Sequence, residues 1–109
     1  MQDIKIKEHN KLVRDKIPDI IKKSGKQAIV TKARGEKLIS FLNSKLKEEL
    51  AEYEQSGAIE ELADIVEVVY AILQHKGISQ EEFNKIRQEK NLNRGAFKKG
   101  LILKRVIEE

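Results

Sequence analysis

The 109-residue chain contains no cysteine and only two histidines. It can therefore form neither disulfides nor thiolate metal sites, it has no cysteine nucleophile, and a histidine-rich metal site is excluded. Long hydrophobic runs are also absent. The longest apolar stretch, between Leu62 and Leu73, is too short for a membrane span and is interrupted by Asp64 and Glu67. No apolar targeting segment follows Met1, so we expect a cytoplasmic protein without a membrane partner.

Hydrophobic residues make up 39% of the chain and charged residues 37%, which predicts a single globular domain over 1–109 with a densely charged surface. The net charge of +4 invites a nucleic-acid interpretation. However, eight acidic residues and a single lysine lie between Lys47 and Glu67, and the basic residues flank this region. An acidic centre with basic flanks suits a metal-bound polyphosphate better than a nucleic acid. We therefore expect no nucleic-acid partner, and binding through the basic ends stays open as an alternative.

Apolar residues recur with the period of an amphipathic helix along most of the chain, and only one proline interrupts it. This predicts an all-α helical bundle with a short helix that has Pro18 in its first turn, followed by helices over about 36–55, 58–76 and 79–93. The expected stops after these four segments are Gly25, Gly57, Gly77 and Gly95. We expect residues 28–31 to form an extended link, and residues 101–107 to form a strand or a packed arm.

Two acidic pairs flank the Ser56-Gly57 turn. Glu49 and Glu52 are three residues apart, and so are Glu61 and Asp64, which places each pair on one helix face. The pairs are mirrored about the turn. If the chain folds back there as an antiparallel helix hairpin, the four carboxylates face one another across the helix–helix contact. Glu61 moreover falls inside the apolar arc of its helix, where an unpaired carboxylate is costly.

Four converging carboxylates repel one another unless a cation lies between them. Oxygen-only ligands favour Mg²⁺, with Mn²⁺ as a second choice. The sequence therefore predicts that Glu49, Glu52, Glu61 and Asp64 hold a divalent metal. The alternative is that these acids are solvated, or that individual acids form salt bridges, for which the candidate partners are Lys45, Lys47 and Arg87.

The motif Glu48-Glu49-x-x-Glu52 followed by Glu61-x-x-Asp64 resembles the signature of the all-α nucleotide pyrophosphohydrolases. These include the MazG-like enzymes, the dimeric dUTPases and the phosphoribosyl-ATP pyrophosphohydrolases. The resemblance implies a MazG-like helical bundle that hydrolyses a nucleoside triphosphate to a monophosphate and pyrophosphate. It also implies Mg²⁺ bound by the same four carboxylates.

The flanking segments, from Asn10 to Pro18 and from Lys90 to Phe97, resemble a small MazG-like subgroup described as phosphoribosyl-ATP pyrophosphohydrolase-like. The chain departs from the subgroup at Ala96, where a glycine is common. Hydrolysis of phosphoribosyl-ATP in histidine biosynthesis and house-cleaning of other nucleotides both fit the resemblance, and the motif does not distinguish these substrates.

We expect a carboxylate that the metal does not consume, Glu48 or Glu49, to orient or deprotonate the attacking water. The candidates for binding the substrate phosphates are basic residues on either side of the acidic centre: Lys11, Arg14, Lys16, Arg87, Lys90 and Arg94. For each of these groups, a solvated basic surface is the competing interpretation.

The helix predicted over 58–76 is apolar around most of its circumference. A chain this short would struggle to cover it, so we expect a homodimer or a larger homo-oligomer. A helical interaction module without a metal and without catalytic activity is the remaining alternative.

Overall fold

The computed structural model describes residues 3–109, and over these residues it is entirely helical, with no β-strand. Its helices are α1 (Ile17–Lys23), α2 (Gly35–Ser56), α3 (Ile59–His75) and α4 (Gln80–Arg94). The predicted all-α class is confirmed, and each helix lies within two residues of its expected bounds. Residues 28–31 and 101–107 carry no regular structure, so the tail does not form the strand that was one of its two predicted forms.

The connection between α2 and α3 is short because Gly57 adopts a left-handed conformation. Its φ is 65° and its N–H donates to the carbonyl oxygen of Tyr53 at 2.7 Å, which ends α2 where the sequence predicts a stop. A residue with a Cβ is disfavoured at this φ. Ala58 is extended, and α3 begins at the next residue.

The start of α4 is defined by a side-chain cap. The Ser79 Oγ accepts a hydrogen bond from the backbone N–H of Glu82 at 3.1 Å, which satisfies one of the free donors of the first turn. Gly77 precedes it with φ 72° and follows the end of α3. The segment Ser79-Gln-Glu-Glu82, whose composition is typical of a helix start, thus begins α4.

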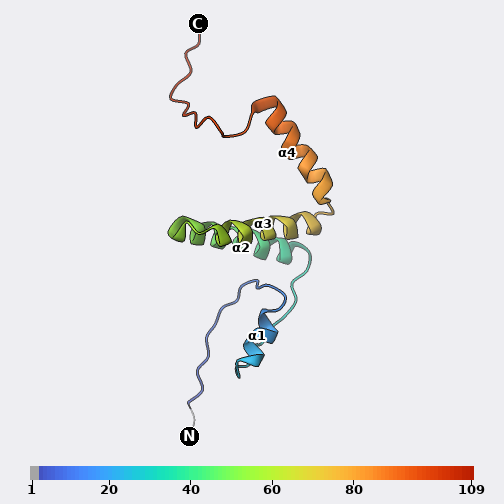
Figure 1. The fold of residues 1–109 in the computed structure, drawn as a ribbon. Coiled ribbons are helices and arrows are strands. Elements are labelled where there is room, and N and C mark those ends of the chain that lie inside the picture. Colours follow the sequence, from blue (N-terminus) through green and yellow to red (C-terminus); the bar gives the residue numbers. More distant parts are fainter. Residues whose placement is uncertain (1–2) are drawn as a thin grey trace.

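The helices α2 and α3 lie side by side, and the other two helices project from this pair (Figure 1). In Figure 1, α1 and the N-terminal segment lie on one side of the pair, and α4 and the C-terminal tail lie on the other. The molecule measures 78 × 31 × 24 Å. Leu42 of α2, with 3% of its surface exposed, is the one fully buried apolar residue in the described part of the chain.

No helix in residues 3–109 has the length and apolar character that crossing a membrane requires.

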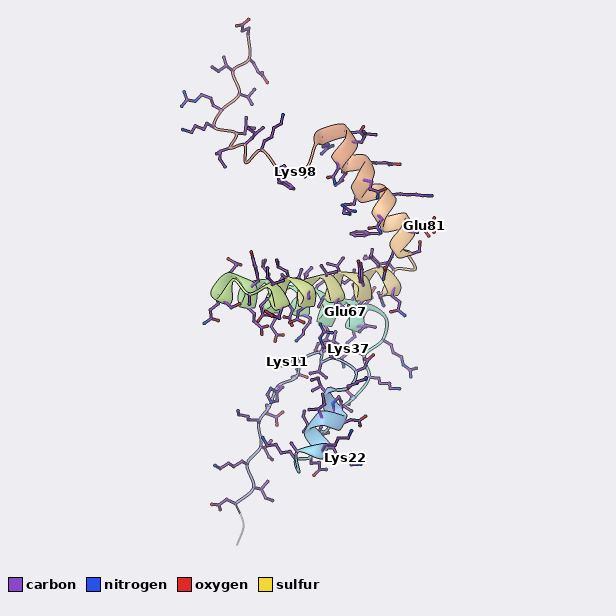
Figure 2. All side chains as sticks on the ribbon, viewed as in Figure 1. Lys11, Lys22, Lys37, Glu67, Glu81 and Lys98 are labelled. Carbon is purple, nitrogen blue, oxygen red and sulfur yellow. The ribbon has the colours of Figure 1, made fainter. Side chains whose placement is uncertain are left out.

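The single chain leaves much of its surface uncovered. Its accessible surface is 10846 Å², whereas a compact protein of this mass has about 6,200 Å². Its radius of gyration is 19.6 Å, compared with about 13 Å for a compact domain of this length. The side chains of α4 and of the tail around Lys98 point into open space (Figure 2). Apolar burial within one chain is therefore too small to account for a stable fold on its own.

An apolar stripe on α3 accounts for part of this exposed surface. Ile59, Leu62 and Val66 follow one another at spacings of three and four residues, and all three are exposed. These spacings place them on one helix face. Such a stripe is an expected contact surface for a second copy of the chain.

We predict that the chain self-associates through this stripe. Sedimentation at micromolar concentration should give a dimer or a larger species. Val66→Lys, which places a charge in the stripe, should shift the population towards monomer. Ile107→Lys in the exposed tail is the matched control and should leave the mass unchanged. A folded wild-type monomer at this concentration would contradict the prediction.

We also predict that Leu42→Ala lowers the free energy of unfolding by about 2–4 kcal/mol, since it removes a buried aliphatic side chain. Leu92→Ala, at a position 86% exposed, should change it by less than about 0.5 kcal/mol. Denaturant unfolding at one fixed protein concentration measures both changes, because self-association makes stability depend on concentration. Equal losses in the two variants would show that α2 does not carry the core.

Candidate functional site

The carboxylates of the two predicted acidic pairs lie along the contact between α2 and α3. Glu49 comes from α2 and is 6% exposed, and it is the one charged residue classed as buried in the described part of the chain. Glu61 and Asp64 come from α3 and are half-buried. One carboxylate oxygen from each of these three residues lies within 4.8 Å of the others. We call Glu49, Glu61 and Asp64 the acidic triad.

The triad could hold a divalent cation. Neighbouring ligand oxygens around a six-coordinate Mg²⁺ are about 3 Å apart and opposite ones about 4.2 Å apart, so the three oxygens would draw closer together around a bound ion. Three carboxylates leave the remaining coordination positions to water or to substrate oxygens, as Mg²⁺ sites that act on phosphates require.

Two oxygens of the triad are buried without a partner. The Oε2 atoms of Glu49 and Glu61 are inaccessible to solvent and accept no hydrogen bond within the described chain. A buried carboxylate oxygen with neither donor nor cation is costly. These two atoms are a second indication, independent of the clustering itself, that the triad could hold a cation.

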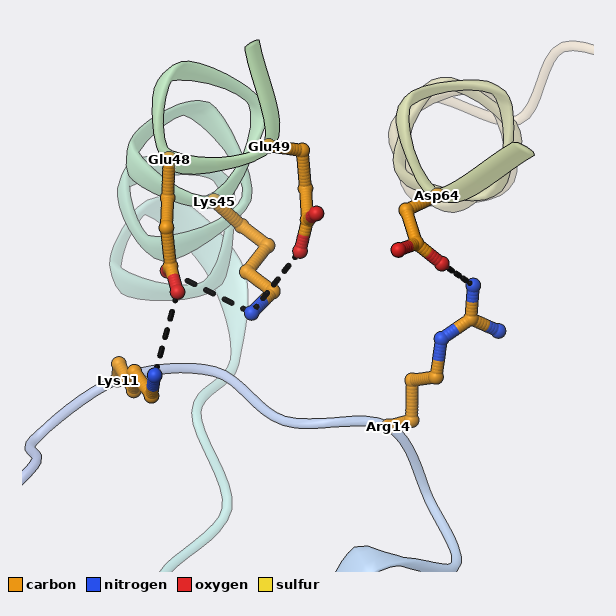
Figure 3. A network of polar contacts seen from close by, with 6 residues as sticks. All are labelled: Lys11, Arg14, Lys45, Glu48, Glu49 and Asp64. Atoms are coloured by element: carbon orange, nitrogen blue, oxygen red, sulfur yellow. Dashed lines mark hydrogen bonds and ion pairs between the residues drawn. The ribbon is translucent and has the colours of Figure 1, made fainter. Parts of the chain in front are cut away.

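The chain supplies cations of its own around the triad (Figure 3). The Lys45 Nζ lies 3.2 Å from Glu49 Oε1 and 3.4 Å from Glu48 Oε2. From the segment before α1, the Lys11 Nζ lies 3.2 Å from Glu48 Oε1. The Arg14 Nη2 lies 2.6 Å from Asp64 Oδ1. Of the four predicted metal ligands, Glu49 and Asp64 therefore form ion pairs, and only Glu49 does so with one of the suggested partners, Lys45.

These ion pairs leave the site short of positive charge. The surrounding carboxylates are Glu48, Glu49, Glu52, Glu61 and Asp64, and the cations are Lys11, Arg14 and Lys45. Formally, five negative and three positive charges leave two negative charges uncompensated. Glu61 has no cationic partner among the described residues. One divalent cation would balance the group.

The two adjacent glutamates of α2 have opposite pKa shifts. Burial raises the pKa of Glu49, Lys45 opposes this, and the neighbouring Glu52 carboxyl reinforces it. Burial also acts to raise the pKa of Glu48, but hydrogen bonds and charges from Lys11 and Lys45 outweigh it and hold that pKa below its ordinary value. Glu48 is therefore held ionised, whereas ionised Glu49 needs a further cation.

Not all predicted site residues come together. Glu52 lies beside Glu49 but is exposed, and it is outside the triad. Lys16 is exposed and makes no ion pair with any described residue. The remaining basic candidates lie on α4, on the other side of the α2–α3 pair from Lys11 and Arg14, and make no ion pair within residues 3–109; they are Arg87, Lys90 and Arg94.

Lys45 was expected only as one of three possible salt-bridge partners. In the structure it contacts both Glu48 and Glu49 and is therefore part of the site. The signal was its position three and four residues before Glu48 and Glu49, which places all three on one stretch of α2. Lys47 and Arg87, the other two suggested partners, form no such pair in the described chain.

A shallow pocket of about 100 Å³ adjoins this site. It is lined by Asn10, Lys11, Leu12, Phe41, Ser44, Lys45 and Glu48. Its lining residues include two lysines and one glutamate, a net charge of +1, and both lysines pair with that glutamate.

Comparison with known proteins adds no relative to this description: no family model, no curated protein and no solved structure matches the chain. The functional conclusion therefore depends on the acidic triad, its two buried oxygens without a partner and the cations that surround it.

Proposed function

We propose that this protein is a Mg²⁺-dependent hydrolase that splits a nucleoside triphosphate into a nucleoside monophosphate and pyrophosphate. The observation that carries the proposal is the triad of Glu49, Glu61 and Asp64, two of whose buried oxygens have no partner. The resemblance of the acidic motif to the all-α nucleotide pyrophosphohydrolases supports it. In that family's terms, the chain would be a MazG-like bundle with a central helix hairpin. It would act in the cytoplasm as a homodimer or a larger oligomer.

The residues present fit a divalent cation. Glu49, Glu61 and Asp64 would hold it, and Glu52, one turn along α2 from Glu49, would complete the four-carboxylate set that the sequence predicts. A bound Mg²⁺ or Mn²⁺ would lower the pKa of a water molecule and neutralise charge on the phosphate oxygens.

The reaction adds water across the anhydride bond between the α- and β-phosphates. In the proposed mechanism, Glu48, which Lys11 and Lys45 hold ionised, would help to orient the attacking water; its lowered pKa makes it a weak proton acceptor. Glu49 would stay a ligand and would help to orient the water. Lys11 and Lys45, which line the adjoining pocket, carry positive charge that would bind the phosphates of the pyrophosphate product.

The exposed apolar stripe on α3 favours a second candidate, a helical interaction module without a metal. In that case the four ion pairs around the triad would be all that the acids require. An absence of any Mg²⁺-dependent thermal shift, together with an absence of pyrophosphate release, would favour this candidate.

We predict that the purified protein releases pyrophosphate from at least one nucleotide in a panel containing canonical, deoxy and damaged nucleoside triphosphates and phosphoribosyl-ATP. The reaction should need Mg²⁺ or Mn²⁺ and should stop with EDTA, because the carboxylates of the triad repel the substrate phosphates unless a cation lies between them. The phosphoribosyl-ATP arm separates a biosynthetic substrate from house-cleaning substrates. Release of orthophosphate alone would contradict the proposed cleavage position.

We predict that Glu61→Gln lowers turnover by roughly a hundredfold or more, since it removes a charge that only a metal would compensate. Glu60→Gln is the matched control: Glu60 is exposed and adjacent on α3, so activity should be unchanged. Circular dichroism should show the same helix content in both variants. Turnover of Glu61→Gln within about tenfold of wild type would remove Glu61 from the site.

A further inference from the structure

Two cations reach the acidic groups from a segment that is remote in sequence. Residues 10–14, which we call the strap, pass beneath both helices of the pair, and Lys11 points to α2 while Arg14 points to α3 (Figure 3). The strap begins with a turn: Asn10 has φ 46°, a left-handed conformation that asparagine tolerates better than most residues. These are the direct polar contacts between the strap and the pair in the described chain.

Arg14 forms an ion pair with Asp64, one of the carboxylates proposed to bind the metal. Its Nη2 donates to Asp64 Oδ1 at 2.6 Å, and Asp64 is a member of the triad. A divalent cation bound by Asp64 would lie within several ångströms of the guanidinium, and like charges at that separation repel. Arg14 therefore opposes binding of a cation that arrives alone.

The same guanidinium is suited to phosphate. Its planar fork matches phosphate oxygens, and arginine remains charged at any physiological pH. The Arg14 side chain is 57% exposed and that of Asp64 35%, so breaking their ion pair costs little. The pocket beside the strap is flanked by Lys11 and Lys45, and it offers further positive charge to a polyphosphate.

We propose that Arg14 makes the binding of a divalent cation and of a polyphosphate at this site depend on each other. Arg14 holds Asp64 while neither ligand is bound, and it transfers to phosphate oxygens when both are bound. This inference rests on the proposed function, and it concerns the order and linkage of binding rather than the reaction itself. Because linkage is reciprocal, the polyphosphate tightens the cation by the same factor as the cation tightens the polyphosphate.

The proposal requires Arg14→Ala to have effects of opposite sign on the two ligands. Binding of Mn²⁺ alone, measured by calorimetry on the full chain, should become about two- to fivefold tighter, the scale of a released ion pair at a partly exposed site. Binding of inorganic tripolyphosphate in excess Mg²⁺ should weaken by about tenfold or more, because a charge-assisted phosphate contact is lost. Arg14→Lys keeps the positive charge, and in both measurements its affinity should lie between those of wild type and Arg14→Ala.

Arg105→Ala is the matched control, since Arg105 is exposed in the tail and makes no ion pair within residues 3–109. It should leave both affinities unchanged. A merely structural role for Arg14 would weaken both ligands in Arg14→Ala, and that result would overturn the proposal, as would unchanged Mn²⁺ affinity.

The failure of the proposed function has a different signature. If neither wild type nor Arg14→Ala binds Mn²⁺, the metal site and the inference both fall. If wild type binds Mn²⁺ and Glu49→Gln abolishes that binding, the metal site stands. In that case the sign of the Arg14→Ala effect alone decides the inference.

Discussion

The burial of one carboxylate, Glu49, between two helices is the constraint on which the rest of the site depends. A carboxylate at 6% exposure loses its hydration and must recover that free energy from cations or donors. Lys45 supplies one contact and leaves the second oxygen without a partner. The contact between α2 and α3 then brings carboxylate oxygens of Glu61 and Asp64 within 4.8 Å of one of Glu49, which increases the demand for positive charge.

The surrounding cations answer that demand in two ways. Lys45 is built into α2 and contacts both Glu48 and Glu49, so it accompanies them whenever the helix forms. Lys11 and Arg14 arrive from a separate segment and meet acids on two different helices. Lys45, on the same helix as its partners, stabilises the folded site. Lys11 and Arg14 come from a separate segment, so their contacts with the acids can be replaced by contacts with another ligand. This division suits a site that binds a cation and an anion together.

The architecture around the site is open. One apolar side chain is fully buried in the described chain, and α1 and α4 project away from the pair. The accessible surface far exceeds that of a compact protein of this mass. The two buried residues, Leu42 and Glu49, both come from α2, and the residues of the apolar stripe on α3 are exposed.

Local chemistry within the sequence determined the helices and their ends. The apolar period, the Ser79 cap and glycines such as Gly57 act over a few residues, so the four helices and the all-α class could be predicted from the residues alone. The i,i+3 spacing paired Glu49 with Glu52 and Glu61 with Asp64, and the mirrored placement of the pairs about the turn made all four candidates for one site, of which the structure clusters Glu49, Glu61 and Asp64.

Only the tertiary structure decided which of the charged residues meet. Lys11 and Arg14 are separated by 37 and 50 residues from the acids they contact, and no local pattern encodes such a pairing. Arg87 and Lys90 share a helix face just as convincingly, yet α4 projects from the far end of α3 and carries them away. An exposed basic side chain has a similar free energy whether or not it pairs with an acid. The paths of the connecting segments therefore determine which basic residues lie beside the acidic triad.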